Sequence, residues 1–259
     1  MQNSTQDSAK NVPDMGKTYD EFADAFGKAD VLPTWRFVGK LAMGNILAPF
    51  LYPGVSFLDF GSASARVEAG VLLPHGVIAS DITGVEISPD QVKMAQARIP
   101  EAHFLVGNVA DPELLESQSA SFDVVFSHMV FEHLSDEQLT QACENAHRLL
   151  KPGGTFAFVV THPDKMTNVD GSLVKAYGPF ETSAPWGGIL HNWRRSVSDS
   201  VDTVQAAGFK VESVEEIEFP EEPPAGLSSD DMPIFAENRD KYRKYPAIRL
   251  AIVAKKPQQ

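Results

Sequence analysis

The 259-residue sequence contains a single cysteine, Cys143. A lone thiol cannot close an internal disulfide or form a Cys-x-x-Cys pair, so a disulfide framework and a cysteine zinc cluster are excluded, and Cys143 is expected to be a buried core thiol. No apolar run approaches the ~18 residues of a membrane span, and residues 1–10 lack the apolar region of a signal peptide. We therefore expect a cytoplasmic protein that is not inserted in a membrane and holds no metal.

Basic residues are also scarce. The chain has 22 lysines and arginines against 35 aspartates and glutamates, which gives a formal net charge of −13. Sequence-independent binding to nucleic acid depends on clustered cations, so this balance argues against a nucleic-acid partner and favours a small-molecule ligand. A homodimer is compatible with the composition.

The hydrophobic fraction of 43% is sufficient for one large core. Residues 1–17 are polar, which predicts a flexible tail, and residues 18–259 are expected to form a single domain. Within it we expect N-terminal helices at 18–50 and an aromatic-rich insert at 163–196, whose composition favours ligand binding over disorder. The acidic, proline-rich segment 218–246 fits either a solvated loop or a second pocket wall.

From residue 55 onward, apolar runs of strand length alternate with helical patterns. Such alternation predicts an α/β fold, in which right-handed crossovers build a mainly parallel sheet with helices on both faces. The expected helices are 64–72, 89–98, 136–150 and 197–207. The expected strands are 55–60, 82–87, 103–107, 122–127, 155–161, 209–217 and 247–255.

The first expected strand leads into a loop of small residues, within the stretch VSFLDFGSASAR at 55–66. Small residues let the backbone approach a ligand, and the following helix points its free N–H groups at the same space. A nicotinamide dinucleotide fingerprint needs glycine at the first, third and sixth loop positions, which here are Gly61, Ala63 and Arg66. An arginine at the sixth position disfavours that cofactor.

Four further motifs follow in order, namely ITGVEIS, LVGNVAD, SFDVVFSHMVFEHL and KPGGTFAFVV. Together with DFGSASA they resemble the class I S-adenosylmethionine-dependent methyltransferases, in particular the small-molecule group that includes quinone-biosynthesis-type enzymes. The resemblance runs from about Tyr19 to Lys256. It implies a Rossmann-like, doubly wound, seven-stranded sheet with an antiparallel last strand, an N-terminal helical lid and an insert after the fifth strand. It also implies S-adenosylmethionine as the cofactor and S-adenosylhomocysteine as the product.

The same resemblance implies which residues bind the cofactor. Glu86 would accept hydrogen bonds from the ribose hydroxyls, Ile87 would pack on the adenine, and Asn108 would face the adenine amino group. The alternatives are a turn for Asn108 and core packing for the lid residue Tyr19. The full expected set is Tyr19, Asp59, Gly61, Ser62, Ala63, Glu86, Ile87, Asn108, Val109, Ser127 and His128.

Methyl transfer from a sulfonium is a direct displacement, so alignment supplies much of the rate, and a general base is needed only for a protonated acceptor. His128 and His162 are the catalytic candidates because both follow strands at the carboxyl edge of the sheet. The resemblance favours a methyltransferase for a small aromatic or polycyclic acceptor. Ala63 and Ala65, at positions where the family has glycine, leave a non-catalytic cofactor-binding protein as the alternative, ahead of a nicotinamide oxidoreductase. Expected acceptor contacts are His162, Tyr177, Trp186, His191, Trp193 and Arg194.

Overall fold

The computed structural model describes residues 15–27 and 33–258. Its main sheet has seven strands in the order β3-β2-β1-β4-β5-β9-β8. Pairing is parallel from β3 to β5, whereas β9 is antiparallel to both of its neighbours. The predicted Rossmann-like sheet with an antiparallel last strand is therefore confirmed. The strands are β1 (Phe57–Phe60), β2 (Ile82–Glu86), β3 (His103–Val106), β4 (Phe122–His128), β5 (Leu150–Thr161), β8 (Lys210–Ile217) and β9 (Arg249–Lys255).

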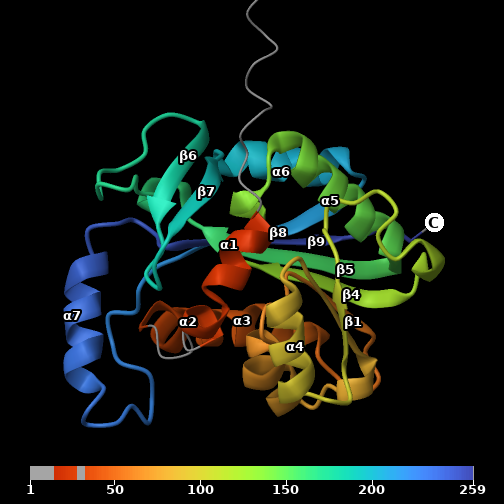
Figure 1. Ribbon diagram of the computed structural model, residues 1–259, viewed down its shortest axis with the longest axis horizontal. Helices are drawn as coiled ribbons and strands as arrows, with labels where there is room; N and C mark the ends of the chain where they lie inside the picture. The colour runs from red at the N-terminus through yellow and green to blue at the C-terminus, as the bar shows by residue number, and fades with distance from the viewer. Residues whose placement is uncertain (1–14, 28–32, 259) are drawn as a thin grey trace, which may run out of the picture.

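Helices cover both faces of this sheet. In Figure 1, α3 (Lys40–Leu47) and α4 (Pro89–Arg98) lie below it, and α5 (Asp136–Leu149) and α6 (Val197–Ala206) lie above it. Consecutive β1 residues face opposite layers, as the two-residue period of a strand requires. Phe57 packs in the same core cluster as Met43, whereas Leu58 packs in the cluster that holds Cys143. Cys143 is fully buried, as predicted.

Serine residues cap three of the helices that flank the sheet. Ser88 Oγ accepts a hydrogen bond from Gln91 N at 3.2 Å, and Pro89 occupies the first helical position. Ser135 and Ser196 each complete a capping box at the start of α5 and α6. These caps fix where each helix begins at the carboxyl edge of the sheet.

The insert contains a hairpin that the sequence pattern did not indicate. Strands β6 (Gly178–Ser183) and β7 (Ile189–Arg194) form a separate two-stranded antiparallel sheet, at the upper left of Figure 1. The buried side of β7 carries Leu190, Asn192 and Arg194. Because two of these three inward side chains are polar, hydrophobic alternation is absent and the strand could not be recognised from its period.

The acidic segment 218–246 contains a helix, α7 (Met232–Tyr242), at the left of Figure 1. The ring of Phe235 is buried, and its centroid lies 5.4 Å from those of both Phe37 and Phe219. Asp231, just before the helix, forms an ion pair with Arg36 at 2.5 Å. The segment is therefore packed against the N-terminal region, so of its two alternatives a wholly solvated loop does not describe it.

The N-terminal helices dock at the start of α4. Helix α1 (Met15–Glu21) brings Asp20 Oδ1 to 2.5 Å from Ser88 Oγ, and Gln91 Nε2 donates to the carbonyl of Ala23 in α2 (Ala23–Gly27) at 3.2 Å. A π-helical turn, η2 (Trp35–Gly39), leads into α3. Of the predicted tail, residues 1–14 lie outside the described residues, and 15–17 belong to α1.

Candidate active site

The loop after β1 folds back over β2. Gly61 N and Ser62 N both donate hydrogen bonds to the Val85 carbonyl, at 2.7 and 3.2 Å. Gly61 has a φ of +84°, and a Cβ atom there would lie only 2.1 Å from Val130 Cγ2. Glycine at this position is therefore required both by the left-handed backbone and by the close approach of the neighbouring loop.

Two alanines continue the loop in the left-handed region, where the family resemblance expects glycine. Ala63 has a φ of +46° and Ala65 a φ of +60°. An L-residue in this region costs roughly 1–2 kcal/mol. The Ala65 methyl is fully buried, whereas Ala63 is partly exposed. Both alanines thus adopt a left-handed backbone conformation that costs glycine less free energy.

Glu86, at the end of β2, holds this loop. Its Oε2 accepts a hydrogen bond from Ala63 N at 3.0 Å, and its Oε1 accepts one from Ser88 N at 2.9 Å. Burial raises the pKa of the Glu86 carboxyl, and these backbone hydrogen bonds oppose the increase. Each carboxylate oxygen keeps a second lone pair for a ligand hydroxyl. Ile87 follows with 37% of its surface exposed, next to the same space.

A pair of acidic residues lies behind the loop. Asp59 is the next-to-last residue of β1, and Glu68 is the first residue of η4 (Glu68–Leu72). Both are almost fully buried. Burial raises the pKa of the Glu68 carboxyl to about 7. Burial, with the charges of Glu68 and Glu86, raises the pKa of the Asp59 carboxyl well above its ordinary value. Asp59, a predicted cofactor-site residue, therefore interacts with a second buried carboxyl, Glu68, which was not expected from the sequence.

Hydrogen bonds from two asparagine side chains hold the loop after β3. Asn108 Oδ1 accepts from Ala110 N at 2.9 Å, which is the turn considered as its alternative role, and Val109 is buried in the core. The buried side chain of Asn145 donates to the carbonyls of Val109 and Asp111, at 2.9 and 2.7 Å. Asn145 was missed because it lies within the apolar stripe of α5, where a buried amide has no sequence signal.

Ser127 and His128 end β4, as predicted, beside the loop after β1. Ser127 Oγ donates to the Phe60 carbonyl at 2.8 Å, which ties β4 to β1. The His128 ring lies 5.6 Å from the ring of Trp35, and its Nε2 is buried without a hydrogen-bond partner within the described ranges. Burial, reinforced by the Arg249 and Arg66 charges, lowers the pKa of His128 to about 3. The imidazole is therefore neutral and a weak base.

A hydrogen-bonded chain joins the N-terminal helix to the hairpin. Tyr19 Oη lies 3.0 Å from His133 Nε2, and His133 Nδ1 lies 2.6 Å from Asn192 Oδ1 on β7. The Tyr19 ring also lies 6.5 Å from that of Trp186. Burial, with the Glu132 and Glu86 charges, raises the pKa of the Tyr19 phenol. Two of the predicted site residues, Tyr19 and Trp186, thus lie close together. His133 and Asn192 extend the hydrogen-bonded chain from Tyr19.

His162 points away from His128. Its Nδ1 accepts from Asp164 N at 3.2 Å, at the start of the short helix η9 (Pro163–Lys165), and its Nε2 lies 3.7 Å from Glu216 Oε1. Glu216 belongs to β8 at the edge of the sheet, separated from β4 by β5 and β9. The structure therefore does not bring the two predicted catalytic histidines together.

Most of the remaining predicted acceptor contacts stabilise the insert itself. Arg194 donates to the carbonyls of Pro163 and Lys175 and pairs with Asp164 at 3.1 Å, and its guanidinium lies 4.5 Å from the centre of the exposed Tyr177 ring. These contacts use each of its nitrogens. In the same hairpin, His191 Nδ1 lies 3.5 Å from Glu181 Oε1, and Trp193 borders a cavity of about 20 Å³.

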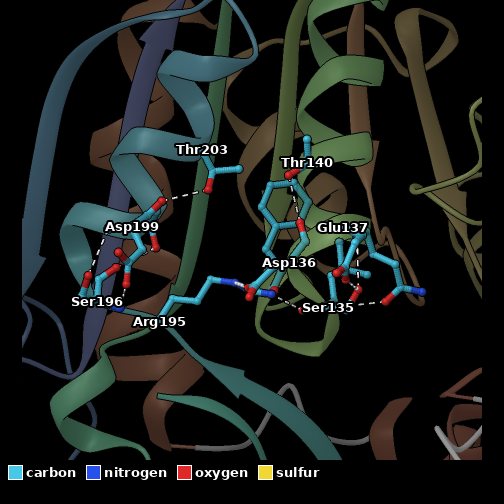
Figure 2. A network of polar contacts seen from close by, with 12 residues as sticks. Ser135, Asp136, Glu137, Thr140, Arg195, Ser196, Asp199 and Thr203 are labelled. Atoms are coloured by element: carbon cyan, nitrogen blue, oxygen red, sulfur yellow. Dashed lines mark hydrogen bonds and ion pairs between the residues drawn. The ribbon is translucent and has the colours of Figure 1, made fainter. Parts of the chain in front are cut away.

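Arg195 joins the starts of two helices. Its Nε donates to Asp136 Oδ1 at 2.7 Å, and its terminal nitrogens donate to the carbonyls of Phe131 and Leu134. Figure 2 shows the side chain reaching from the start of α6 to the capped start of α5. Arg195 therefore positions the loop that carries His133.

Glu132 is a buried carboxylate in the same loop, which the sequence analysis did not single out. Its Oε1 accepts from Thr161 N and Oγ1 at 3.4 and 3.2 Å, and its Oε2 is buried without a partner among the residues described. Burial lowers the pKa of the Arg249 guanidinium, and the Glu132 charge opposes this effect. An acidic residue between Phe131 and His133 in an otherwise apolar stretch was the available signal.

Residues 15–27 and 33–258 contain no group of three or more His, Cys, Asp or Glu side chains arranged to hold a metal ion. Among the helices that the structure describes, none has both the length and the apolar character needed to cross a bilayer.

Comparison with known proteins agrees with this fold. A family model described as a methyltransferase domain matches residues 58–158, which include β1 to β5 up to Phe158. The matched segment contains the loop after β1, Glu86 and the end of β4. Residues 58–158 therefore contain a methyltransferase domain, and the sheet order is the one found in class I S-adenosylmethionine-dependent methyltransferases, which the chain resembles.

Individual relatives cover different shares of the chain. Arsenite methyltransferase of Aquipseudomonas alcaligenes is 30% identical over 130 residues, which is 47% of this chain and 37% of that protein. The chain thus spans well under two thirds of this curated relative. A putative methyltransferase of Haloferax volcanii, solved with the Trm112 activator, has a TM-score of 0.66 at 24% identity over 95% of this chain and 99% of its own.

A third relative was solved with ligands bound. It is the 1,6-didemethyltoxoflavin-N1-methyltransferase of Burkholderia thailandensis, in complex with 1,6-didemethyltoxoflavin and S-adenosylhomocysteine. Its TM-score is 0.56 at 16% identity, over 98% of this chain and 99% of that one. At this identity the comparison establishes a shared fold.

Proposed function

We propose that the chain transfers a methyl group from S-adenosylmethionine to a small aromatic or polycyclic acceptor and releases S-adenosylhomocysteine. The observation that carries the proposal is the position of Glu86, a buried carboxylate that ends β2 and also fixes the loop after β1. Relatives named for arsenite and for 1,6-didemethyltoxoflavin support a small-molecule acceptor. Arsenite has no ring, so the aromatic part of the proposal rests on the Tyr19 and Trp186 rings.

The residues present fit this cofactor. Glu86 keeps lone pairs for two vicinal hydroxyls, and Ile87 exposes an apolar surface suited to adenine beside it. Gly61 lets the loop after β1 turn beside Val130, which occupies the space that a side chain at Gly61 would need. The rest of the proposed binding set is Tyr19, Asp59, Ser62, Ala63, Asn108, Val109, Ser127 and His128.

The bound cofactor would supply a methyl group already activated by the sulfonium, so the chain's task is alignment and exclusion of water. Tyr19 and Trp186 form an aromatic contact between the N-terminal helix and the insert, which suits a planar acceptor. For a protonated acceptor, Tyr19 can take the proton while its own phenolic proton passes to His133 Nε2. In this proposal His128 shapes the wall beside the reacting groups.

Calorimetric titration with S-adenosylmethionine tests the cofactor assignment. We expect Glu86→Ala to weaken binding by roughly tenfold or more, since a hydrogen bond to a charged group contributes about 1.5–3 kcal/mol. Glu86→Gln should lose less, because its amide oxygen still accepts. Glu101→Ala, an exposed carboxylate after α4, is the matched control. Unchanged affinity in Glu86→Ala would refute the ribose assignment.

Turnover separates the enzyme from a binding protein with the same fold. A panel of small aromatic acceptors with labelled S-adenosylmethionine should yield a methylated product and S-adenosylhomocysteine. Tight cofactor binding without product across such a panel would favour a regulatory or scaffold role. Stabilisation by NAD, with none by S-adenosylmethionine, would instead support an oxidoreductase.

A further inference from the structure

Two cations, Arg249 and Lys165, lie at the carboxyl edge of the sheet beyond the end of β4. Arg249 is the first residue of β9, where it pairs with Thr161 at the end of β5, and it is 7% exposed. Lys165 ends the short helix η9 after β5 and is partly buried. Its Nζ lies 4.9 Å from the centre of the Tyr242 ring, at the end of the α7 helix seen at the left of Figure 1.

The Arg249 charge acts on both Lys165 and His128. Burial lowers the pKa of Lys165 well below its ordinary value, and the Arg249 charge adds to the decrease. Burial lowers the pKa of His128 to about 3, and the Arg249 charge reinforces that decrease as well. Charges interact in this way only over short distances and where water screens them poorly. The three side chains therefore border one region of the candidate active site.

The negative charge in this region is smaller than that of the two cations together. Glu132, which is 3% exposed, is the carboxylate whose charge acts on both Lys165 and Arg249. Asp164, next to Lys165, pairs with Arg194 instead, at 3.1 Å. Neither Lys165 nor Arg249 forms an ion pair among the residues that the structure describes. One buried carboxylate thus faces two cations, and a charge buried without a partner is costly.

We propose that Arg249 and Lys165 bind a carboxylate group of the methyl acceptor, which makes the acceptor a small aromatic acid. This inference deepens the methyltransferase proposal and rests on it. An excess of one positive charge matches a carboxylate rather than a doubly charged phosphate. The guanidinium can donate to both carboxylate oxygens, and the ammonium adds a further charged donor. A bound carboxylate would also give the buried Arg249 Nε the partner that it lacks within the described ranges.

The strand order gives such an acceptor a direction. The sequence β2-β1-β4-β5-β9 across the sheet places the end of β4, with His128, between the cofactor position beside Glu86 and the start of β9. Ligands of open parallel sheets bind at this carboxyl edge. An acceptor whose carboxylate is bound by Arg249 therefore extends across His128 toward the cofactor position.

Calorimetric titration of the full chain with benzoate, without cofactor, tests this carboxylate site. Benzamide has the same ring without the charge and is the comparison ligand. Benzoate should bind at least roughly tenfold more tightly, because benzamide cannot form the charge-assisted contacts. Lys165→Met should weaken benzoate binding roughly five- to tenfold and leave benzamide binding unchanged. Methionine keeps an apolar chain beside Tyr242, so the variant is expected to fold.

Arg249→Met removes the other cation. With folding checked by circular dichroism, this variant should lower the preference for benzoate over benzamide roughly tenfold, and Arg249→Lys, which retains the charge, should restore part of it. In a ¹³C-labelled sample of the original chain, benzoate should shift the ring resonances of His128. Unchanged His128 resonances at saturating benzoate would place the anion elsewhere and overturn the proposal.

Lys241→Met is the matched control. Lys241 Nζ lies 5.4 Å from the centre of the same Tyr242 ring, but its side chain is exposed on α7. This variant should change benzoate affinity by less than about twofold, because water screens an exposed charge. Equal affinity for benzoate and benzamide, or equal losses in Lys165→Met and Lys241→Met, would overturn the carboxylate site. Affinity for S-adenosylmethionine, which Lys165→Met should leave unchanged, tests the methyltransferase proposal separately in the same samples.

Discussion

Tyr19 Oη and His133 Nε2 are 3.0 Å apart, although 114 positions separate the two residues in the chain. The other imidazole nitrogen faces the Asn192 amide oxygen at 2.6 Å. An amide oxygen only accepts, so Nδ1 carries the imidazole proton and Nε2 accepts from the Tyr19 phenol. One imidazole therefore connects the N-terminal helix, the loop after β4 and the hairpin.

Tyr19→Phe should loosen helix α1 without unfolding the sheet. The change leaves His133 Nε2 without its donor, at a cost of about 1–2 kcal/mol. Amide hydrogen exchange in residues 15–21 should then accelerate by roughly five- to thirtyfold, since exchange reports local opening. Tyr52→Phe, on an exposed side chain before β1, should leave it unchanged. Equal protection of α1 in Tyr19→Phe and the original chain would show that the hydroxyl does not hold the helix.

Ala63→Gly should stabilise the loop after β1. Relief of the left-handed alanine gains roughly 1–2 kcal/mol, and the greater freedom of glycine in the unfolded chain offsets about 0.5–1 of it. The free energy of unfolding by urea should rise by about 0.5–1 kcal/mol, with equal or tighter binding of S-adenosylmethionine.

Ala97→Gly supplies the opposite control for this experiment. Ala97 is exposed in α4 with helical backbone, so glycine there should destabilise the protein by about 1 kcal/mol. A loss of stability in both variants would indicate that the Ala63 methyl group contributes more through packing than its φ of +46° costs.

The central part of the sheet could be predicted because its strands are buried and therefore appear as continuous apolar runs between turn signals. The edge strands β3 and β8 are largely exposed. The loop after β1 and Glu86 could be placed because their motifs occur in order along the chain. Hairpin β6–β7 and helix α7 could not, since the inward positions of β7 include Asn192 and Arg194, and α7 has a single buried residue, Phe235. The packing of these elements produces no periodic pattern of apolar residues in the local sequence.

The same limit applies within the site. His128 and Glu86 could be assigned from the strands they end, because the carboxyl ends of parallel strands share one edge. The partners of His133 come from residues 114 and 59 positions away, and no periodicity links them. For His162, the preceding strand is correctly predicted but the direction of the side chain is not. Its Nδ1 accepts from Asp164 N, and the ring turns toward Glu216 in β8.

Glu68→Gln should change how stability depends on pH. The folded-state pKa of Glu68 is about 7, above its ordinary value of 4.5, so the folded protein holds a proton that the unfolded chain releases. Stability is therefore lost as pH rises from about 4.5 to about 7. Glutamine does not titrate, so it removes this loss of folding stability with rising pH, and its amide can donate a hydrogen bond to Asp59. Relative to the original chain, Glu68→Gln should gain on the order of 2–3 kcal/mol between pH 5 and pH 8.

Urea unfolding at several pH values measures that difference directly. Glu113→Gln, an exposed carboxyl before the β4 segment, serves as the control and should track the original chain at every pH. If the stability curves of Glu68→Gln and the original chain run parallel from pH 5 to pH 8, Glu68 does not titrate in this range.

His128 should remain neutral throughout the range in which a histidine ordinarily titrates. Its pKa is lowered to about 3 by burial and by the Arg249 and Arg66 charges. Ring resonances in a ¹³C-labelled sample, assigned by their loss in His128→Gln, should show no inflection between pH 5 and pH 8. An inflection near 6.5 would mean that the ring is solvated and available as a base.

The stability of His128→Gln gives a second measurement with a definite sign. A histidine whose folded-state pKa is lowered binds its proton more readily in the unfolded chain, so it costs stability as pH falls below about 6.5. The variant should therefore gain on the original chain by about 1.4 kcal/mol per pH unit between pH 6 and pH 4. Glu68 contributes the opposite trend to both proteins, and the comparison cancels it because both retain Glu68. A constant difference would show that His128 is protonated equally in both states.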